Sequence, residues 1–286
     1  MRIKIILILL VSLTMNGIAQ KMDLVHLWPG KVPGEKSSKH SPVISSDTSN
    51  NVMRISEVTD PSFIIFEPNS AHKNNASVLI CPGGGYQILA MDLEGYEIAK
   101  WLSKAGYTAF LLQYRVPQKQ EGALQDAQRA LRIIRGDAVK YKIDPDKIGI
   151  MGFSAGGSLS ARVSTRFNDK TYTPVDKFDE LSARPAFTML IYPAYLDEGP
   201  NNSLTPELIL TTNTPPMFIF QTSDDPYGNS ALVMAQSLRN AKIPVELHFY
   251  PKGGHGYGIR SGNPAAETWT KLAEIWLTQT LFSLRK

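Results

Sequence analysis

The chain has 286 residues, of which 43% are hydrophobic, and this is enough for a sizeable buried core. The formal net charge is only +4 and the basic residues form no cluster, which argues against a nucleic-acid partner. Cys81 is the single cysteine, so an internal disulfide is excluded, and no metal-binding motif is apparent. We therefore expect a globular domain that is stabilised by its core and needs no cofactor or metal.

The N-terminus reads "MRIKIILILLVSLTMNGIAQKM" and has the pattern of a secretory signal. Arg2 and Lys4 precede a short apolar run, and Ala19 ends a stretch of small residues that a signal peptidase could read. The apolar run is too short for an ordinary membrane span. We predict a signal peptide over residues 1–19, with an uncleaved N-terminal anchor as the alternative. The mature protein is then exported, periplasmic or extracellular, without a stable membrane anchor.

Residues 20–51 are polar and predict an extended arm that lies over the domain. The runs "NVMRISEV" and "SFIIFEP" follow, and the turn residues between them predict a β-hairpin. Strands and helices then alternate. The predicted strands, which are apolar on both faces, are 77–81, 108–114, 147–152, 187–192, 217–223 and 245–250. The predicted helices, which have helical spacing or lie between strands, are 93–106, 122–141, 154–166, 230–241 and 266–284.

A hairpin followed by six strands that alternate with helices predicts a mostly parallel eight-stranded sheet with helices on both faces. Residues 52–286 would form this single α/β domain. The polar link between the strands at 187–192 and 217–223 predicts no large lid. Ligands bind beyond the carboxyl ends of the strands in such sheets, so the chemistry should lie in the turns that follow them.

The sequence "GFSAG", residues 152–156, follows a predicted strand and opens a predicted helix. It matches G-x-S-x-G, the turn that presents a nucleophilic serine. Glycines are needed there because the turn is strained and crowded, and the helix N-terminus favours developing negative charge. We predict that Ser154 is a nucleophile; the alternative is a structural helix N-cap.

A serine nucleophile needs a general base and a carboxylate that orients it. His255 lies in the glycine-rich turn "KGGHGYG" directly after the last predicted strand, and we predict that it is the base. Asp224 and Asp225 follow the preceding strand in "TSDDPYG". We favour Asp225, which is stiffened by the following proline, and keep Asp224 as the alternative.

The tetrahedral intermediate of ester hydrolysis also needs backbone donors for its oxyanion. The turn "CPGGGY" follows the strand at 77–81 and has three consecutive glycines with accessible N–H groups. We predict that the N–H groups of Gly84, Gly85 and Ala155 form an oxyanion hole. A flexible loop without this role is the alternative.

With the chain order Ser154, Asp225, His255, these motifs resemble those of the α/β-hydrolase superfamily. Within it, the chain is similar to small exported esterases often labelled acetyl xylan esterases. The resemblance covers nearly all of the mature chain and includes "HLWPGKVPGE", "CPGGGYQILAMDLEGYEIAKWLSKAGYTAFLLQYRVP" and "VELHFYPKGGHGYG". In the lipase-like branch the glycine loop usually begins with histidine, whereas Pro82 stands here. This departure favours the carbohydrate-esterase branch.

The resemblance implies a serine esterase that removes acetyl groups from plant cell-wall carbohydrate such as xylan. Tyr86, Tyr227 and Tyr257 lie next to the three loops and could stack on a sugar ring. A general short-chain carboxylesterase remains the main alternative, and a serine peptidase, a glycoside hydrolase and a non-catalytic sugar-binding module are less favoured. The acyl range, the sugar and the oligomeric state stay open.

Overall fold

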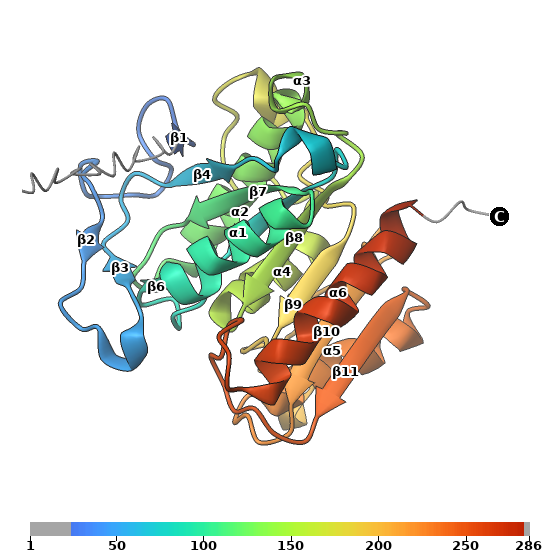
Figure 1. The fold of residues 1–286 in the computed structure, drawn as a ribbon. Coiled ribbons are helices and arrows are strands. Elements are labelled where there is room, and N and C mark those ends of the chain that lie inside the picture. The colour runs from blue at the N-terminus through green and yellow to red at the C-terminus, as the bar shows by residue number, and fades with distance from the viewer. Residues whose placement is uncertain (1–23, 283–286) are drawn as a thin grey trace, which may run out of the picture.

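One sheet forms the centre of the protein in the computed structural model, which describes residues 24–282. Its strands are β1 (Leu24–His26), β4 (Ser62–Phe66), β5 (Ser77–Cys81), β7 (Thr108–Gln113), β8 (Ile148–Phe153), β9 (Thr188–Ile191), β10 (Met217–Thr222) and β11 (Val245–Tyr250). Their order is β1-β4-β7-β5-β8-β9-β10-β11, and only β4 runs against the others (Figure 1). The predicted α/β-hydrolase fold with a mostly parallel eight-stranded sheet is confirmed.

Helices cover both faces of this sheet. They are α1 (Glu97–Lys104), α2 (Gln120–Gly136), α3 (Ala138–Tyr141), α4 (Ala155–Thr165), α5 (Gly228–Asn240) and α6 (Pro264–Phe282). Helices α1 and α6 lie on one face, where Trp101 and Trp269 meet edge to face, whereas α2, α4 and α5 cover the other (Figure 1). This double cover explains why the central strands are apolar on both sides. Within residues 24–282, no helix combines the length and the apolar character that a membrane crossing needs.

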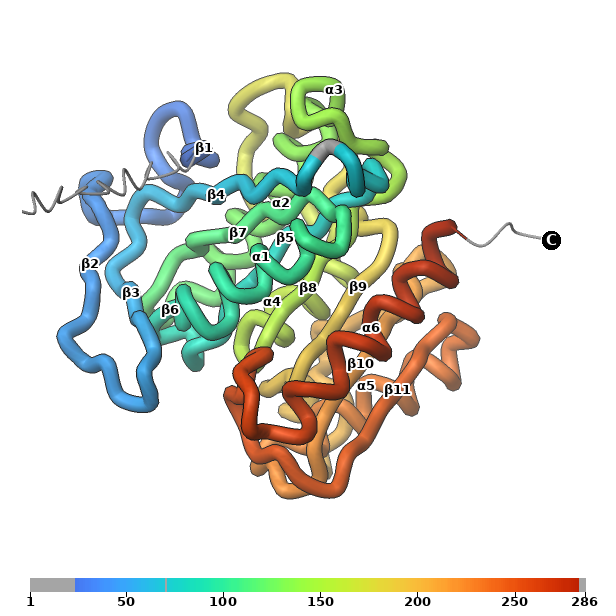
Figure 2. Tube along the Cα trace, in the orientation of Figure 1, coloured from blue at the N-terminus to red at the C-terminus, as the bar shows by residue number. Residues whose placement is uncertain are grey.

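The predicted β-hairpin is wrong. Strand β3 (Arg54–Ser56) pairs with β2 (Val43–Ile44) and β6 (Leu89–Ala90) in a small separate sheet, shown beside the main one in Figure 2. Strand β4 instead lies between β1 and β7. Both edges of β4 are thus occupied, and no edge is left for β3.

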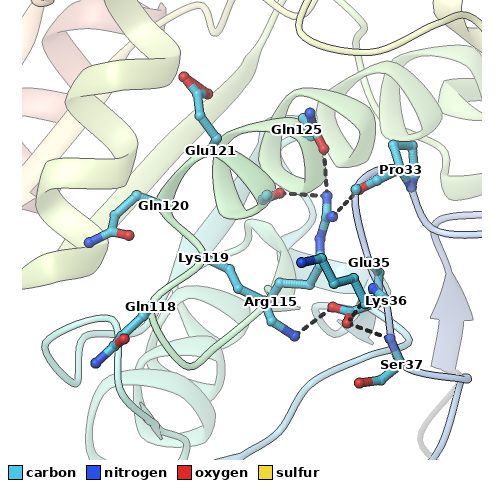
Figure 3. Close-up of a pocket in the computed structure, with 12 residues that line it drawn as sticks. Pro33, Glu35, Lys36, Ser37, Arg115, Gln118, Lys119, Gln120, Glu121 and Gln125 are labelled. Atoms are coloured by element: carbon cyan, nitrogen blue, oxygen red, sulfur yellow. Dashed lines mark hydrogen bonds and ion pairs between the residues drawn. The ribbon is translucent and has the colours of Figure 1, made fainter.

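The N-terminal arm is bound more firmly than its polar composition suggested. Its β1 joins the main sheet, and the Trp28 side chain is buried and donates from Nε1 to Asp126 Oδ1 at 2.9 Å. The other oxygen, Oδ2, accepts from Arg115 Nε at 2.8 Å, and Arg115 Nη1 donates to the Pro33 carbonyl of the arm (Figure 3). A buried ion pair on the domain therefore holds the arm in place. The predicted signal peptide, residues 1–19, lies outside the described residues.

We expect Asp126→Ala to destabilise the protein by about 3–5 kcal/mol, because it leaves the buried Arg115 guanidinium without its counter-ion. Trp28 Nε1 loses its acceptor in the same variant. Urea denaturation followed by tryptophan fluorescence measures this change. A loss of less than about 1 kcal/mol would contradict the anchoring role of the ion pair.

Candidate active site

Ser154 stands at the sharp turn between β8 and α4. Its φ of 51° and ψ of −119° are strained for a residue with a side chain. A Cβ on Gly152 would lie 1.9 Å from the Gly156 carbonyl oxygen, and one on Gly156 would lie 2.0 Å from the Cys81 carbonyl oxygen. Only glycine allows β8, α4 and the end of β5 to approach so closely.

The structure brings Ser154, His255 and Asp225 together at the carboxyl end of the sheet. His255 Nε2 lies 2.7 Å from Ser154 Oγ, and His255 Nδ1 lies 2.7 Å from Asp225 Oδ2. The Asp225 side chain is fully buried, and its Oδ1 accepts the Tyr227 N–H at 2.8 Å. With the Nδ1 proton donated to Asp225, Nε2 is left to accept the serine proton. This arrangement can activate a serine hydroxyl for attack.

Asp224, the alternative carboxylate, has a different surrounding. Its Oδ1 accepts the N–H groups of Gly253 and Gly254, at 3.0 and 2.8 Å. The backbone N–H of Gly254, followed by that of Gly253, holds the pKa of Asp224 below its usual range. Asp224 thus fastens the start of the loop that carries His255, whereas Asp225 contacts the imidazole.

The glycine turn after β5 lies directly against Ser154. A Cβ on Gly83 would be 2.8 Å from Ser154 Cβ, while Gly84 and Gly85 have φ values of +130° and +64°. Among residues 24–282, no acceptor takes the backbone N–H of Gly84, Gly85 or Ala155. The three predicted donors are thus available to a ligand oxygen. The N–H of Gly83 is not, because it donates to Glu94 Oε2 at 2.7 Å.

The three tyrosines proposed to contact a sugar differ in position. Tyr227 is partly exposed, and its ring centroid lies 4.9 Å from that of His255. Tyr86 is buried, with one side on a small cavity. Tyr257 is buried against Tyr192, with 4.5 Å between ring centroids, so its ring is not presented to solvent.

A polar cavity of about 200 Å³ opens beside the glycine turn. Its lining combines aromatic rings with charged and amide groups: Gly85, Tyr86, Gln120, Arg162, Tyr195 and Glu198. Ser158 and Glu207 hold the Arg162 guanidinium, which leaves little freedom in its orientation. Gln120 also lines a larger cavity of about 780 Å³, between the start of α2 and the N-terminal arm (Figure 3).

Several residues of this site have no recognisable motif. Arg162 lies within α4, and Gln120 is the first residue of α2, so no short motif links either of them to Ser154. Glu94 and Tyr192 are buried. Tyr192 has one usable signal, since it directly follows a strand at the edge where active-site residues gather. Within the described part of the chain, no three His, Cys, Asp or Glu side chains are grouped as a metal site would require.

Comparisons with known proteins place this geometry in a family. The BD-FAE family model matches residues 64–189. An acetylxylan esterase of Xylanibacter ruminicola is 31% identical over 233 residues, which is 72% of this chain and 46% of that protein. Endo-1,4-beta-xylanase B of Butyrivibrio fibrisolvens is 35% identical over 210 residues, or 64% of this chain and 32% of the relative. This chain thus spans less than half of these curated relatives.

A solved structure agrees over almost its full length. The acetyl ester-xyloside bifunctional hydrolase from Caldicellulosiruptor lactoaceticus superposes with a TM-score of 0.73 at 31% identity, covering 92% of this chain and 98% of that one. The fold, the serine turn and these relatives lead to one conclusion. The chain belongs to the α/β-hydrolase superfamily, in its acetylxylan esterase-like branch.

Proposed function

We propose that this protein is a serine esterase that removes acetyl groups from plant cell-wall carbohydrate such as xylan. The observation that carries the proposal is the hydrogen-bonded series Ser154–His255–Asp225, with both contacts at 2.7 Å. The names of the relatives, an acetylxylan esterase, a xylanase and an acetyl ester-xyloside hydrolase, support the substrate class.

The geometry supports a two-step acyl transfer. His255 Nε2 takes the proton of Ser154 as Oγ attacks the ester carbonyl, and Asp225 stabilises the resulting imidazolium. The N–H of Ala155 and those of Gly84 and Gly85 would bind the oxyanion, and one such donor contributes about 3–4 kcal/mol to the transition state. His255 then protonates the departing sugar oxygen. Water hydrolyses the acetyl-Ser154 by the same proton transfers in reverse, which releases acetate.

The polar cavity supports a sugar rather than a long acyl chain as the group bound beside Ser154. Glu198, Gln120 and Arg162 can hydrogen-bond to hydroxyl groups, and Tyr195 offers an aromatic face. A lipid chain would cover these polar groups without offering them a hydrogen-bond partner. The lining includes a single carboxylate, Glu198, whereas glycoside hydrolysis needs a pair that flanks the bond.

We further propose that the protein is exported through the secretory pathway. The support is the sequence of residues 1–19, with its basic start, short apolar run and small residues. Mass spectrometry of the mature N-terminus, after expression of the full chain in a host that exports it, tests this proposal.

We expect the protein to release acetate from acetylated xylo-oligosaccharides with a higher kcat/KM than from an aryl acetate. Ser154→Ala should lower both activities by about 10³-fold or more, because the nucleophile is removed. Glu198→Ala and Gln120→Ala should each raise KM for the oligosaccharide by about tenfold or less, with little effect on the aryl ester. Acetate assays of the four proteins measure this.

The outcomes separate the alternatives. Hydrolysis of aryl acetate alone would keep the mechanism and favour a general short-chain carboxylesterase. Cleavage of an aryl xyloside at a comparable rate would contradict the restriction to esters. Full activity of Ser154→Ala on either ester would overturn the proposed nucleophile.

The two neighbouring aspartates should differ sharply. Asp225→Asn should lower kcat for an aryl acetate by about 10³- to 10⁴-fold, because an amide no longer holds the required His255 tautomer. Asp224→Asn keeps an oxygen acceptor for Gly253 and Gly254, so we expect a loss of about tenfold or less. Equal losses in steady-state kinetics would show that the orienting role is not specific to Asp225.

A further inference from the structure

We propose that Glu94 is a positioning residue that fixes the oxyanion turn and the His255 loop relative to each other. It is a buried carboxyl on the short π-helix Asp92–Tyr96 (η3), which precedes α1. The inference rests on the proposed roles of Ser154 and His255. It adds a buried residue that touches neither substrate nor nucleophile.

One oxygen of Glu94 binds the oxyanion turn. Oε2 accepts the Gly83 N–H at 2.7 Å, and a Cβ on Gly83 would lie 2.6 Å from the same oxygen. Gly83 immediately precedes the two predicted donors of this turn and packs against Ser154. Its N–H, held by Glu94, fixes the peptide from which Gly84 and Gly85 continue.

The other oxygen reaches the His255 loop through Tyr192. Glu94 Oε1 accepts the Tyr192 hydroxyl at 2.8 Å, and that hydroxyl accepts the Gly258 N–H at 3.0 Å. The Tyr192 ring also packs edge to face against His255, with 5.2 Å between centroids. Tyr192 therefore packs against the imidazole and connects the His255 loop to Glu94.

The backbone of the π-helix touches the same loop directly. A Cβ on Gly258 would lie 2.7 Å from the Leu93 carbonyl oxygen, so the two backbones are in close contact. Trp269 Nε1 in α6 donates to the Gly258 carbonyl at 2.9 Å and holds its other side. Single-turn π-helices occur frequently at functional sites, and this one lies between two catalytic loops.

Glu94 accepts a hydrogen bond at each of its oxygens. The Gly83 N–H can only donate, and the Tyr192 hydroxyl donates to Glu94 while its oxygen accepts from Gly258. Burial raises the pKa of Glu94, whereas the bonds from Tyr192 and Gly83 and the nearby His255 oppose this rise. A glutamine could keep the Gly83 bond with its amide oxygen and donate from its NH2 group to the Tyr192 oxygen, so the informative replacement is Glu94→Leu, which has a similar size and removes both acceptors.

The test compares Glu94→Leu and Tyr192→Phe with wild type in aryl acetate hydrolysis. We expect each to lower kcat by about 10- to 100-fold with KM changed less than about threefold, because the displaced donors act on the transition state. Inhibition by a trifluoromethyl ketone, which forms a tetrahedral oxyanion on a serine, should weaken by a similar factor. The kcat of the double variant should be no lower than that of the more impaired single variant, because Glu94 and Tyr192 belong to the same hydrogen-bonded network.

A second, partly buried pair controls for the loss of a tyrosine–carboxylate contact. Tyr172 donates to Asp179 at 2.6 Å, and neither residue contacts the catalytic loops. Tyr172→Phe and Asp179→Asn should lower the thermal midpoint but leave kcat per folded active site unchanged, as measured by active-site titration.

Two results would overturn the inference: Glu94→Leu with kcat within twofold of wild type, or a loss fully explained by fewer folded active sites. If Glu94→Leu does not fold, Tyr192→Phe alone decides by the same criteria. Ser154→Ala, assayed alongside, tests the proposed function separately. If this variant were active, Ser154 would not be the nucleophile, whatever the role of Glu94.

Discussion

The close approach of three backbone segments at Gly152, Gly156 and Cys81 is the constraint on which the site depends. Strand β8 must end against α4, and α4 must begin against the end of β5, with less space than one methyl group needs. This packing forces Ser154 into its strained turn and places the glycine turn after β5 beside it. Ser154 and the free N–H groups of the glycine turn thus become neighbours through backbone contact, before any side chain contributes.

The loops that carry His255 and Asp225 are fixed by a second set of contacts. Asp224 fastens the start of the His255 loop, and Gly258 fastens its end through Tyr192. Because the buried carboxylate of Asp225 binds the imidazole between these two points, a small shift of the loop would lengthen the 2.7 Å contacts. Such contacts are sensitive to shifts well below the size of an atom.

The sequence was sufficient to predict those features that depend only on residues close together in the chain. A strand followed by "GFSAG" or "KGGHGYG" predicts both a turn and its place at the edge of the sheet, so the positions of Ser154 and His255 followed from short motifs. The hairpin failed because strand pairing depends on distant partners, and the edge expected for β3 is taken by β1 from the arm. The sequences of β1 and β3 do not themselves indicate which of the two pairs with β4.

The buried polar contacts could not be predicted from the sequence either. Glu94 looks like an ordinary acidic residue in "DLEGYEIAKW", and only the fold brings it to Tyr192, ninety-eight positions further on. Trp28 in the N-terminal arm joins Asp126 over the same separation. Long-range pairs of this kind hold the arm and the catalytic loops on a sheet whose own residues were predictable.

The most direct test of the account is whether the acetyl group passes through Ser154. Rapid quenching of the enzyme with an aryl acetate, followed by digestion and mass spectrometry, would detect the acyl-enzyme. We predict that the peptide containing Ser154 gains the mass of one acetyl group, and that the same treatment of Ser154→Ala gives no acetylated peptide at this position. An acetyl group found on another peptide, or turnover without any acetylated peptide, would contradict the central claim.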